Sequence, residues 1–296
     1  MKTTLFTLVI SSLLFFSFTK PKKPITTLDE MKKAMKIGYA YVPSGNMIYE
    51  GDTVSVQGFF MYKNEVSNFD YMEYLYSLKS DGKIDEYTAA LPDTSAWRAP
   101  LTYGEKYVEY YFRHPAYRNY PVVNLTKAQA EKYCEWLTTV WRKNTGNESI
   151  IFRLPMRAEY MKAAFGNSME RTYSWSSPYL LNDKGMSQCN FMNIGAGAIS
   201  RDPETGKLIV ITDKIHDDAG YDGADLTAPA NSFFPNEFGI YHLNGNVSEM
   251  VKEDGIAVGG DWNSPGYDVR NESTKVFTKA NPMVGFRPVM TFVETK

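Results

Sequence analysis

The glycine-rich and asparagine-rich stretch at residues 233–288 constrains the fold of this chain more than any other. Its motifs are NEFGIY at 236–241, GNVSE at 245–249 and GGDW at 259–262. Glycine, asparagine and aspartate separate short apolar pieces there, and these residue types favour tight turns. The stretch therefore predicts backbone that bends closely around a site rather than a long helix or sheet.

Regular elements are predicted mainly before residue 165. Residues 40–45 and 53–61 alternate as short strands do, and Ser67 or Asn68 can cap a helix that follows. Thr126 and Gln129 form a capping box that opens a second helix. Residues 80–111 contain Pro92, Pro100 and Gly104 and predict an irregular excursion, which serves as a connection or in recognition. Within the irregular region 173–229, only residues 207–212 predict a strand.

Composition bounds the class of protein. A chain of 296 residues with 43% hydrophobic content can bury one large core, and a single domain is expected. The net charge is −2 and no basic run is present, so no nucleic-acid partner is expected.

The N-terminus has the layout of an export signal. Lys2 precedes an apolar run over residues 5–18, and a Lys-rich and Pro-rich segment follows. We expect a signal peptide at 1–19, a linker at 20–36 and the domain at 37–296. An uncleaved anchor is the alternative. The mature chain is then expected in the periplasm or at the outer membrane, without a transmembrane span. No cysteine ends the run, so lipid attachment is not expected.

Cys134 and Cys189 form either a disulfide or two separate buried thiols.

The ordered set of motifs resembles the formylglycine-generating enzyme (sulfatase-modifying factor) family. The resemblance includes the three motifs above, GFR at 285–287, EVSNFDY at 65–71 and RLPMRAEY at 153–160. HPAYRNYPVV at 114–123 and the helix after it resemble the gliding-motility and type IX secretion lipoproteins of Bacteroidota. The resemblance implies one loop-rich α+β domain similar to C-type lectin-like folds.

Family enzymes oxidise a substrate cysteine with copper held by two cysteines. Ser264 and Val269 stand at those two positions, and neither side chain can replace a thiolate ligand of copper(I). No copper is expected. The three histidines lie far apart in sequence and do not have the spacing of an iron or zinc site.

The resemblance therefore implies a catalytically inactive binding or scaffold protein with a protein or peptide partner in the cell envelope. The rivals are an enzyme with new chemistry at Asp261, Ser264 and Asp268, and a calcium-dependent glycan-binding module. Asp261 and Asp268 could form a carboxylate pair, but two acids in a glycine-rich loop are expected to be solvated instead. Arg287 is expected to hold core carbonyls or a carboxylate. The groove candidates are Ser248, Asp261, Trp262, Ser264 and Asp268.

The resemblance also implies structural calcium. The first site would use Asn190, the Phe191 carbonyl, Asp222 and the Ala224 carbonyl, which are hard oxygen ligands. From the residues alone these segments read as turns.

A second calcium site would use Gly245, Val247 and Glu249 together with an asparagine that is His242 in this chain. Imidazole is a poor calcium ligand, which weakens this site. Glu249 is alternatively a buried, hydrogen-bonded carboxylate.

Overall fold

The computed structural model describes residues 25–100, 104–193, 199–210, 224 and 226–293. Its helices are α1 Leu28–Met35, α2 Asn68–Ser80, α3 Ile84–Ala89, α4 Glu105–Tyr110, α5 Lys127–Thr145 and α6 Arg157–Phe165, with 3-10 turns η1 Thr94–Arg98 and η2 Pro115–Tyr117. Its strands are β1 Tyr39–Val42, β2 Gly45–Tyr49, β3 Asp52–Val56, β4 Phe59–Tyr62, β5 Ile150–Arg153, β6 Ile199–Arg201, β7 Leu208–Val210, β8 Ser248–Met250, β9 Ile256–Val258, β10 Thr274–Val276, β11 Val284–Gly285 and β12 Val289–Phe292. This is the loop-rich α+β domain predicted from the sequence.

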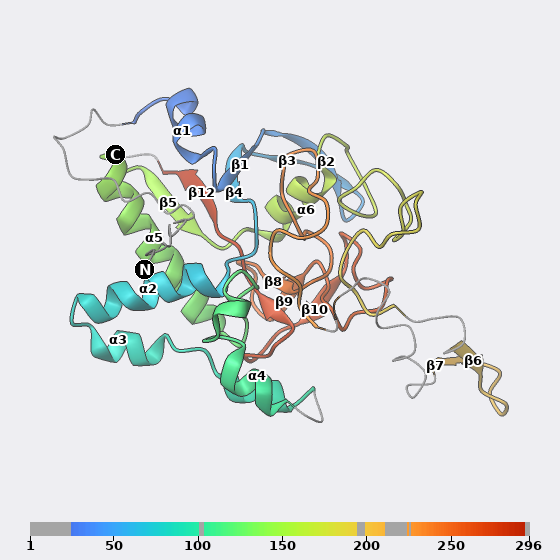
Figure 1. Cartoon of the computed structure of the whole chain (residues 1–296). Helices are drawn as coiled ribbons and strands as arrows, with labels where there is room; N and C mark the ends of the chain where they lie inside the picture. Colours follow the sequence, from blue (N-terminus) through green and yellow to red (C-terminus); the bar gives the residue numbers. More distant parts are fainter. Residues whose placement is uncertain (1–24, 101–103, 194–198, 211–223, 225, 294–296) are drawn as a thin grey trace, which may run out of the picture.

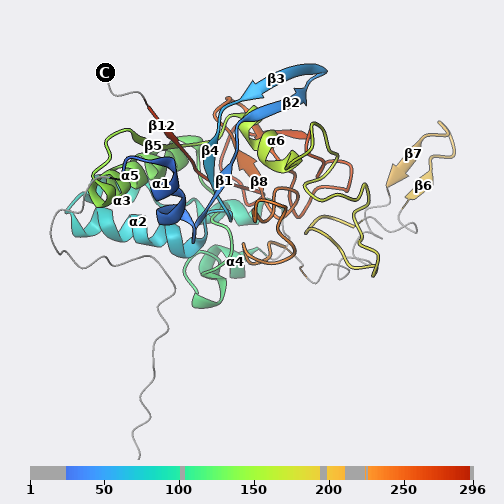
Figure 2. The same ribbon diagram turned by 90° about the horizontal axis from the view of Figure 1, so that it is seen from above.

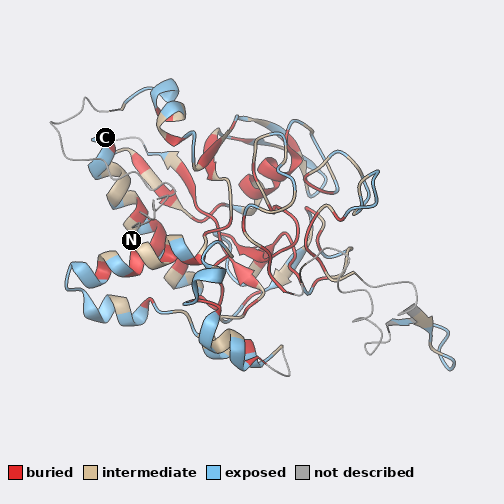
Figure 3. Ribbon diagram, in the orientation of Figure 1, coloured by how far each residue is buried: buried red, intermediate tan, exposed pale blue. Residues whose placement is uncertain are grey.

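A central antiparallel sheet in the order β1-β4-β12-β5 separates two hydrophobic cores. Successive side chains of a strand point to opposite faces. Tyr39 and Phe60 therefore pack with α1, α2 and α5, while Ala40 and Phe59 pack with α6 on the other side. Figures 1 and 2 show this division, and Figure 3 shows the buried residues gathered around the sheet.

Both predicted helix starts are confirmed. The Ser67 hydroxyl accepts from the Asp70 backbone N–H and caps α2, and Thr126 with Gln129 closes a reciprocal capping box on α5. These local bonds satisfy backbone donors that the first helical turn leaves free. The start of each helix is thus encoded within four residues.

Helix α1 lies inside the segment that was expected to be a linker. Met31 and Met35 are buried, on the side of the helix that faces the central sheet. Thr27 and Glu30 form a capping box at its start. Part of the expected linker at 20–36 is therefore a packed helix of the domain, because two methionines at helical spacing bury against the core.

The expected irregular excursion at 80–111 contains α3, η1 and α4. Its anchor is Trp97, which is fully buried and lies 6.5 Å from the Trp262 ring at an interplanar angle of 22°. Gly104 permits the bend before α4, because a Cβ there would lie 2.4 Å from the Trp97 carbonyl oxygen. The prediction of an irregular segment was wrong. Trp97 packs on Tyr107 of α4, and α3 packs on α2, so tertiary contacts stabilise helices too short to show a period.

A second sheet in the order β10-β9-β8-β11 lies beneath the first in Figure 1 and carries the GNVSE motif on β8. The strand predicted at 207–212 is present as β7, paired with β6 in a hairpin drawn apart from the two sheets. Cys134 and Cys189 are buried in different clusters and are not joined by a disulfide. In the described part of the chain, no helix has the length and apolar character that a membrane span requires.

Candidate functional site

The loop after β9 folds back on itself because of its glycine pair. Gly259 and Gly260 have φ values of 86° and 68°, a region that favours glycine. A Cβ on Gly260 would lie 2.6 Å from the Asp268 carbonyl oxygen and 2.7 Å from Val269 Cγ1. The close approach at Gly260 holds residues 268–269 against the start of the loop.

Asp261 is the centre of a buried polar cluster. Its Oδ2 accepts from Ser248 Oγ at 2.9 Å and from Lys275 Nζ at 2.6 Å, and its Oδ1 accepts from the Asn263 N–H at 3.0 Å. The Asp261 N–H donates to Ser264 Oγ at 3.2 Å. Lys275 reaches the carboxylate because β10 pairs antiparallel with β9. The cluster satisfies a carboxylate that is fully buried.

The five groove candidates do not line a common groove. Ser248, Asp261, Trp262 and Ser264 are buried, and only Asp268 is exposed. The expectation of solvation is confirmed for Asp268 and wrong for Asp261. The two carboxylates differ so strongly in environment that they do not form a paired site.

Ser264 and Val269, at the two positions where the resemblance places family cysteines, are both buried. Val269 is fully buried and packs with Tyr173, Cys189 and Phe191. The Ser264 carbonyl accepts from the Met192 N–H at 3.0 Å. The loop at 259–270 therefore packs against residues 173–192.

Glu249, a predicted ligand of the second calcium site, forms a fully buried ion pair with Arg287. Both Glu249 oxygens accept from Arg287, from Nε and Nη2, each at 2.6 Å. Tyr160 also donates to Glu249 Oε1 at 3.2 Å. Burial raises the pKa of the Glu249 carboxyl, while the Arg287 guanidinium opposes that shift. Glu249 thus has the alternative role considered above, a hydrogen-bonded carboxylate, and these partners leave it poorly suited to calcium.

Arg287 has the role that the sequence predicted. Besides Glu249, it donates to the carbonyl oxygens of Lys63, Tyr241 and His242 at 2.8–3.2 Å. Burial disfavours its charge, but the Glu249 carboxylate outweighs burial and holds the pKa of Arg287 above its ordinary value. The guanidinium therefore fastens the C-terminal strand to the loop at 241–242.

Glu65 completes this buried centre from the loop before α2. Its carboxylate accepts from Asn246 Nδ2 at 2.6 Å and from the Val247 N–H at 3.2 Å. Burial, reinforced by Glu249, raises the pKa of Glu65 well above its ordinary value. These two bonds fix the GNVSE motif.

His242 is buried and neutral. Its Nε2 lies 3.2 Å from both Ser232 Oγ and the Pro229 carbonyl oxygen. Burial, followed by the nearby Arg287 charge, lowers the pKa of His242 to about 3. The residue is a structural imidazole beside the centre.

The first calcium site is described only in part. Asn190 is buried, and its Nδ2 donates to the Leu226 carbonyl at 2.6 Å and to Asn246 Oδ1 at 3.1 Å. Oδ1 is the side-chain atom that calcium would take, together with the carbonyls of Phe191, the next residue, and of Ala224. Asp222 lies outside the described residues, so this site stays a prediction.

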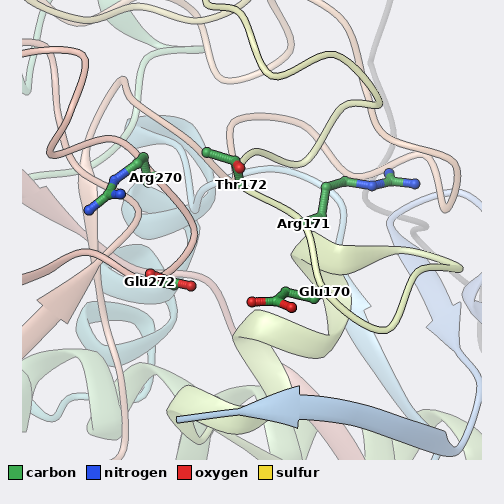
Figure 4. A pocket seen from close by; sticks show the side chains of 5 residues that line it. All are labelled: Glu170, Arg171, Thr172, Arg270 and Glu272. Carbon is green, nitrogen blue, oxygen red and sulfur yellow. The ribbon is translucent and has the colours of Figure 1, made fainter. Parts of the chain in front are cut away.

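A charged pocket of about 300 Å³ opens beside the loop at 261–273 (Figure 4). The Arg171 guanidinium pairs with Glu237 at 2.7 Å, and Arg270 lies over the Tyr267 ring at 3.6 Å and donates to its carbonyl. Sequence reasoning missed this pocket, because its acids and arginines come from two loops about a hundred residues apart. The lining residues are Glu170, Arg171, Thr172, Arg270 and Glu272.

The fold and its buried Glu-Asn-Arg centre define a sulfatase-modifying-factor type of domain. Residues 28–292 match the sulfatase-modifying factor enzyme 1-like domain, and the chain belongs to that family. It is similar to the formylglycine-generating enzyme of Mus musculus, with 24% identity over 253 residues, 78% of this chain and 55% of the relative. It is also similar to that of Thermomonospora curvata, with 31% identity over 135 residues, 46% of this chain and 34% of the relative.

The chain thus spans about half the length of the mouse relative and about a third of the bacterial one. Among solved structures, PvdO from Pseudomonas aeruginosa has a similar fold. The TM-score is 0.52 at 17% identity, over 85% of this chain and 93% of PvdO. The likeness to PvdO shows the fold alone.

Proposed function

We propose that this domain is an exported, catalytically inactive member of its family that binds a protein or peptide partner in the cell envelope. The observation that carries the proposal is the loop at 259–270. Ser264 and Val269 replace the two thiolates that copper would require, and both side chains are packed in the interior. The loop keeps its folded shape without the ligands for the family chemistry.

The charged pocket beside that loop supplies a recognition surface. Arg171 is paired with Glu237, whereas Arg270 contacts only the Tyr267 ring and carbonyl, and Glu170 and Glu272 form no side-chain ion pair or hydrogen bond with another described residue. Two unpaired carboxylates against one unpaired guanidinium leave the pocket negative, which favours a partner segment that carries a basic side chain. The partner is proposed to belong to the gliding or type IX secretion apparatus, by the resemblance of residues 114–123.

Export rests on the N-terminal signal layout. The mature protein is expected to start near Lys20 in the periplasmic or outer-membrane fraction. An intact Met1 in the cytosol would contradict export without bearing on the binding role.

Two measurements test the proposal. With copper and a cysteine-containing family substrate peptide, mass spectrometry should find no formylglycine product; product formation would overturn inactivity. In parallel, crosslinked pull-down of the mature chain from its own envelope should recover partner proteins, and the Glu170→Gln, Glu272→Gln double variant should recover them less.

The matched control is Glu131→Gln on the exposed side of α5, which should recover the partners as the wild type does. Equal recovery by the double variant would remove the charged pocket from the proposal. An empty pull-down with the wild type would overturn the binding role itself.

A further inference from the structure

Strand β10 lies at one side of the second sheet and pairs along one of its edges only. The sheet order is β10-β9-β8-β11, so no described strand pairs with the outer edge of β10. The Phe277 N–H donates to the Gly255 carbonyl at 2.9 Å, so these two residues are a hydrogen-bonded pair. Bonded and non-bonded pairs alternate along an antiparallel ladder. Thr274 and Val276 therefore direct their N–H and C=O groups to the outer edge.

Neither charge nor a covering segment in the described part of the chain protects this edge. No backbone hydrogen bond joins Thr274 or Val276 to a described residue on that side. Charged side chains on an edge strand discourage pairing, but Lys275 turns its ammonium to Asp261, on the opposite face from Val276. Val276 is 77% exposed, and Thr274 is exposed beside it. Exposed β-branched residues with free backbone groups form a template for one more strand.

The charged pocket lies at the N-terminal end of the same edge. Glu272, which lines the pocket, precedes β10 by two residues, a separation of about 7 Å at most. Asn271 joins the two loops of the pocket, because its N–H donates to the Thr172 carbonyl at 2.8 Å. Figure 4 shows the Glu170 and Glu272 carboxylates on one side of the pocket, with the Arg171 guanidinium directed away from them. A strand added to β10 would thus run toward two unpaired carboxylates.

We infer that the partner adds an extended segment to β10 in the antiparallel direction, with an apolar residue, a β-branched residue and a basic residue at every second position. The inference rests on the proposed binding function and names its mode. The apolar residue lies opposite Val276, the β-branched residue opposite Thr274 and the basic residue opposite Glu272, since directly opposed side chains share a face. Proline is excluded from the first two of these positions, because both must donate to the edge.

The test is a titration of the purified chain with the peptide SVSVSKS, followed by two-dimensional amide NMR. The amide resonances of Thr274 and Val276 should shift as the peptide is added. Replacing the peptide lysine with glutamate should weaken the affinity about fivefold, and replacing the second valine with proline should abolish binding. Absence of shifts at these two residues, or equal affinity for the lysine and glutamate peptides, would overturn the inference.

Val276→Pro removes the outward N–H, and an edge position whose N–H faces solvent accepts proline without loss of a ladder bond. This variant should lose peptide binding. Val276→Thr keeps the N–H and a β-branched side chain, so it is the matched control and should bind as the wild type does. Glu272→Gln, at an exposed position, should weaken binding about fivefold and keeps the test decisive if Val276→Pro does not fold.

The envelope pull-down separates this inference from the proposed function. If the wild type and Val276→Pro recover the same partners equally, the binding role stands and strand addition is overturned. If the wild type recovers no partner, the binding role itself fails. Self-association of the wild type in sedimentation, lost in Val276→Pro, would assign the edge to a second copy of the chain instead.

Discussion

Asp261 depends on a partner that enters from another strand. Lys275 Nζ lies 2.6 Å from its carboxylate, and the lysine side chain is 41% exposed while Asp261 is buried. Lys275→Met leaves a buried carboxylate without its cation. We expect a loss of about 2 kcal/mol in the free energy of unfolding, less than for a fully buried pair because solvent reaches the lysine. Urea denaturation measures the loss.

Lys279→Met is the control for that variant. Lys279 is exposed and lies four residues further along the chain. Its removal should change stability by less than about 0.5 kcal/mol. Equal unfolding energies for the two variants would contradict a stabilising role for the Asp261 pair.

His242 predicts a specific pH dependence. Its pKa falls from the ordinary value of 6.5 to about 3 in the folded protein, so below pH 6.5 the unfolded chain binds a proton that the folded chain does not. The stability that neutral His242 contributes is complete above pH 6.5 and is lost as the pH falls toward 3. The expected slope is about 1.4 kcal/mol per pH unit.

His242→Asn is the matching variant, since asparagine tolerates the positive φ of 51° at this position. The difference between the urea stabilities of variant and wild type should change over pH 4–6 with that slope. A difference independent of pH would show that the imidazole titrates normally.

Residue roles were predictable where chemistry leaves few choices. An arginine in the GFR motif must satisfy its donors when buried, and Arg287 does so on carbonyls and Glu249. Asp261 was not predictable, because its burial depends on Lys275 and on the pairing of β9 with β10. No local sequence pattern in the loop predicts that β9 pairs with β10.

At the scale of elements, α1 supplies a test that separates a packed helix from a linker. Met31 is fully buried against the central core. Met31→Ala should cost roughly 2–5 kcal/mol of stability, as buried methionine truncations do. Thermal or urea unfolding measures it, with exposed Lys33→Ala expected to have almost no effect. A neutral Met31→Ala would restore the linker interpretation.

The contrast between α2 and α3 explains which elements the sequence revealed. Ser67 caps α2 through a bond three residues away, which is a purely local signal. Helix α3 has six residues and no side-chain cap, and none of its residues is buried. Such a short helix depends on its neighbours, so sequence periodicity cannot detect it.

For the whole molecule, the fold class followed from the order of motifs, while the sheet orders did not. The order β1-β4-β12-β5 places the last strand between two early ones, and the glycine-rich loops between them carry no signal for that arrangement. The charged pocket likewise joins two loops about a hundred residues apart, at 170–172 and 270–272, and was therefore not predictable from the sequence.

The predicted calcium would act on the whole molecule, because its ligands come from two separate segments, 190–191 and 222–224. A cation that binds only the folded chain at a hundredfold excess over its Kd adds about 2.7 kcal/mol of stability. Chelator should then lower the Tm by roughly 5 °C or more. Asp222→Ala should abolish that sensitivity, whereas Asp183→Ala, at an exposed position, should keep it. If chelator does not change the Tm of the wild type, the site is ruled out. Residues 190–191 would then be held by the hydrogen bonds from the Asn190 side-chain amide to Leu226 and Asn246.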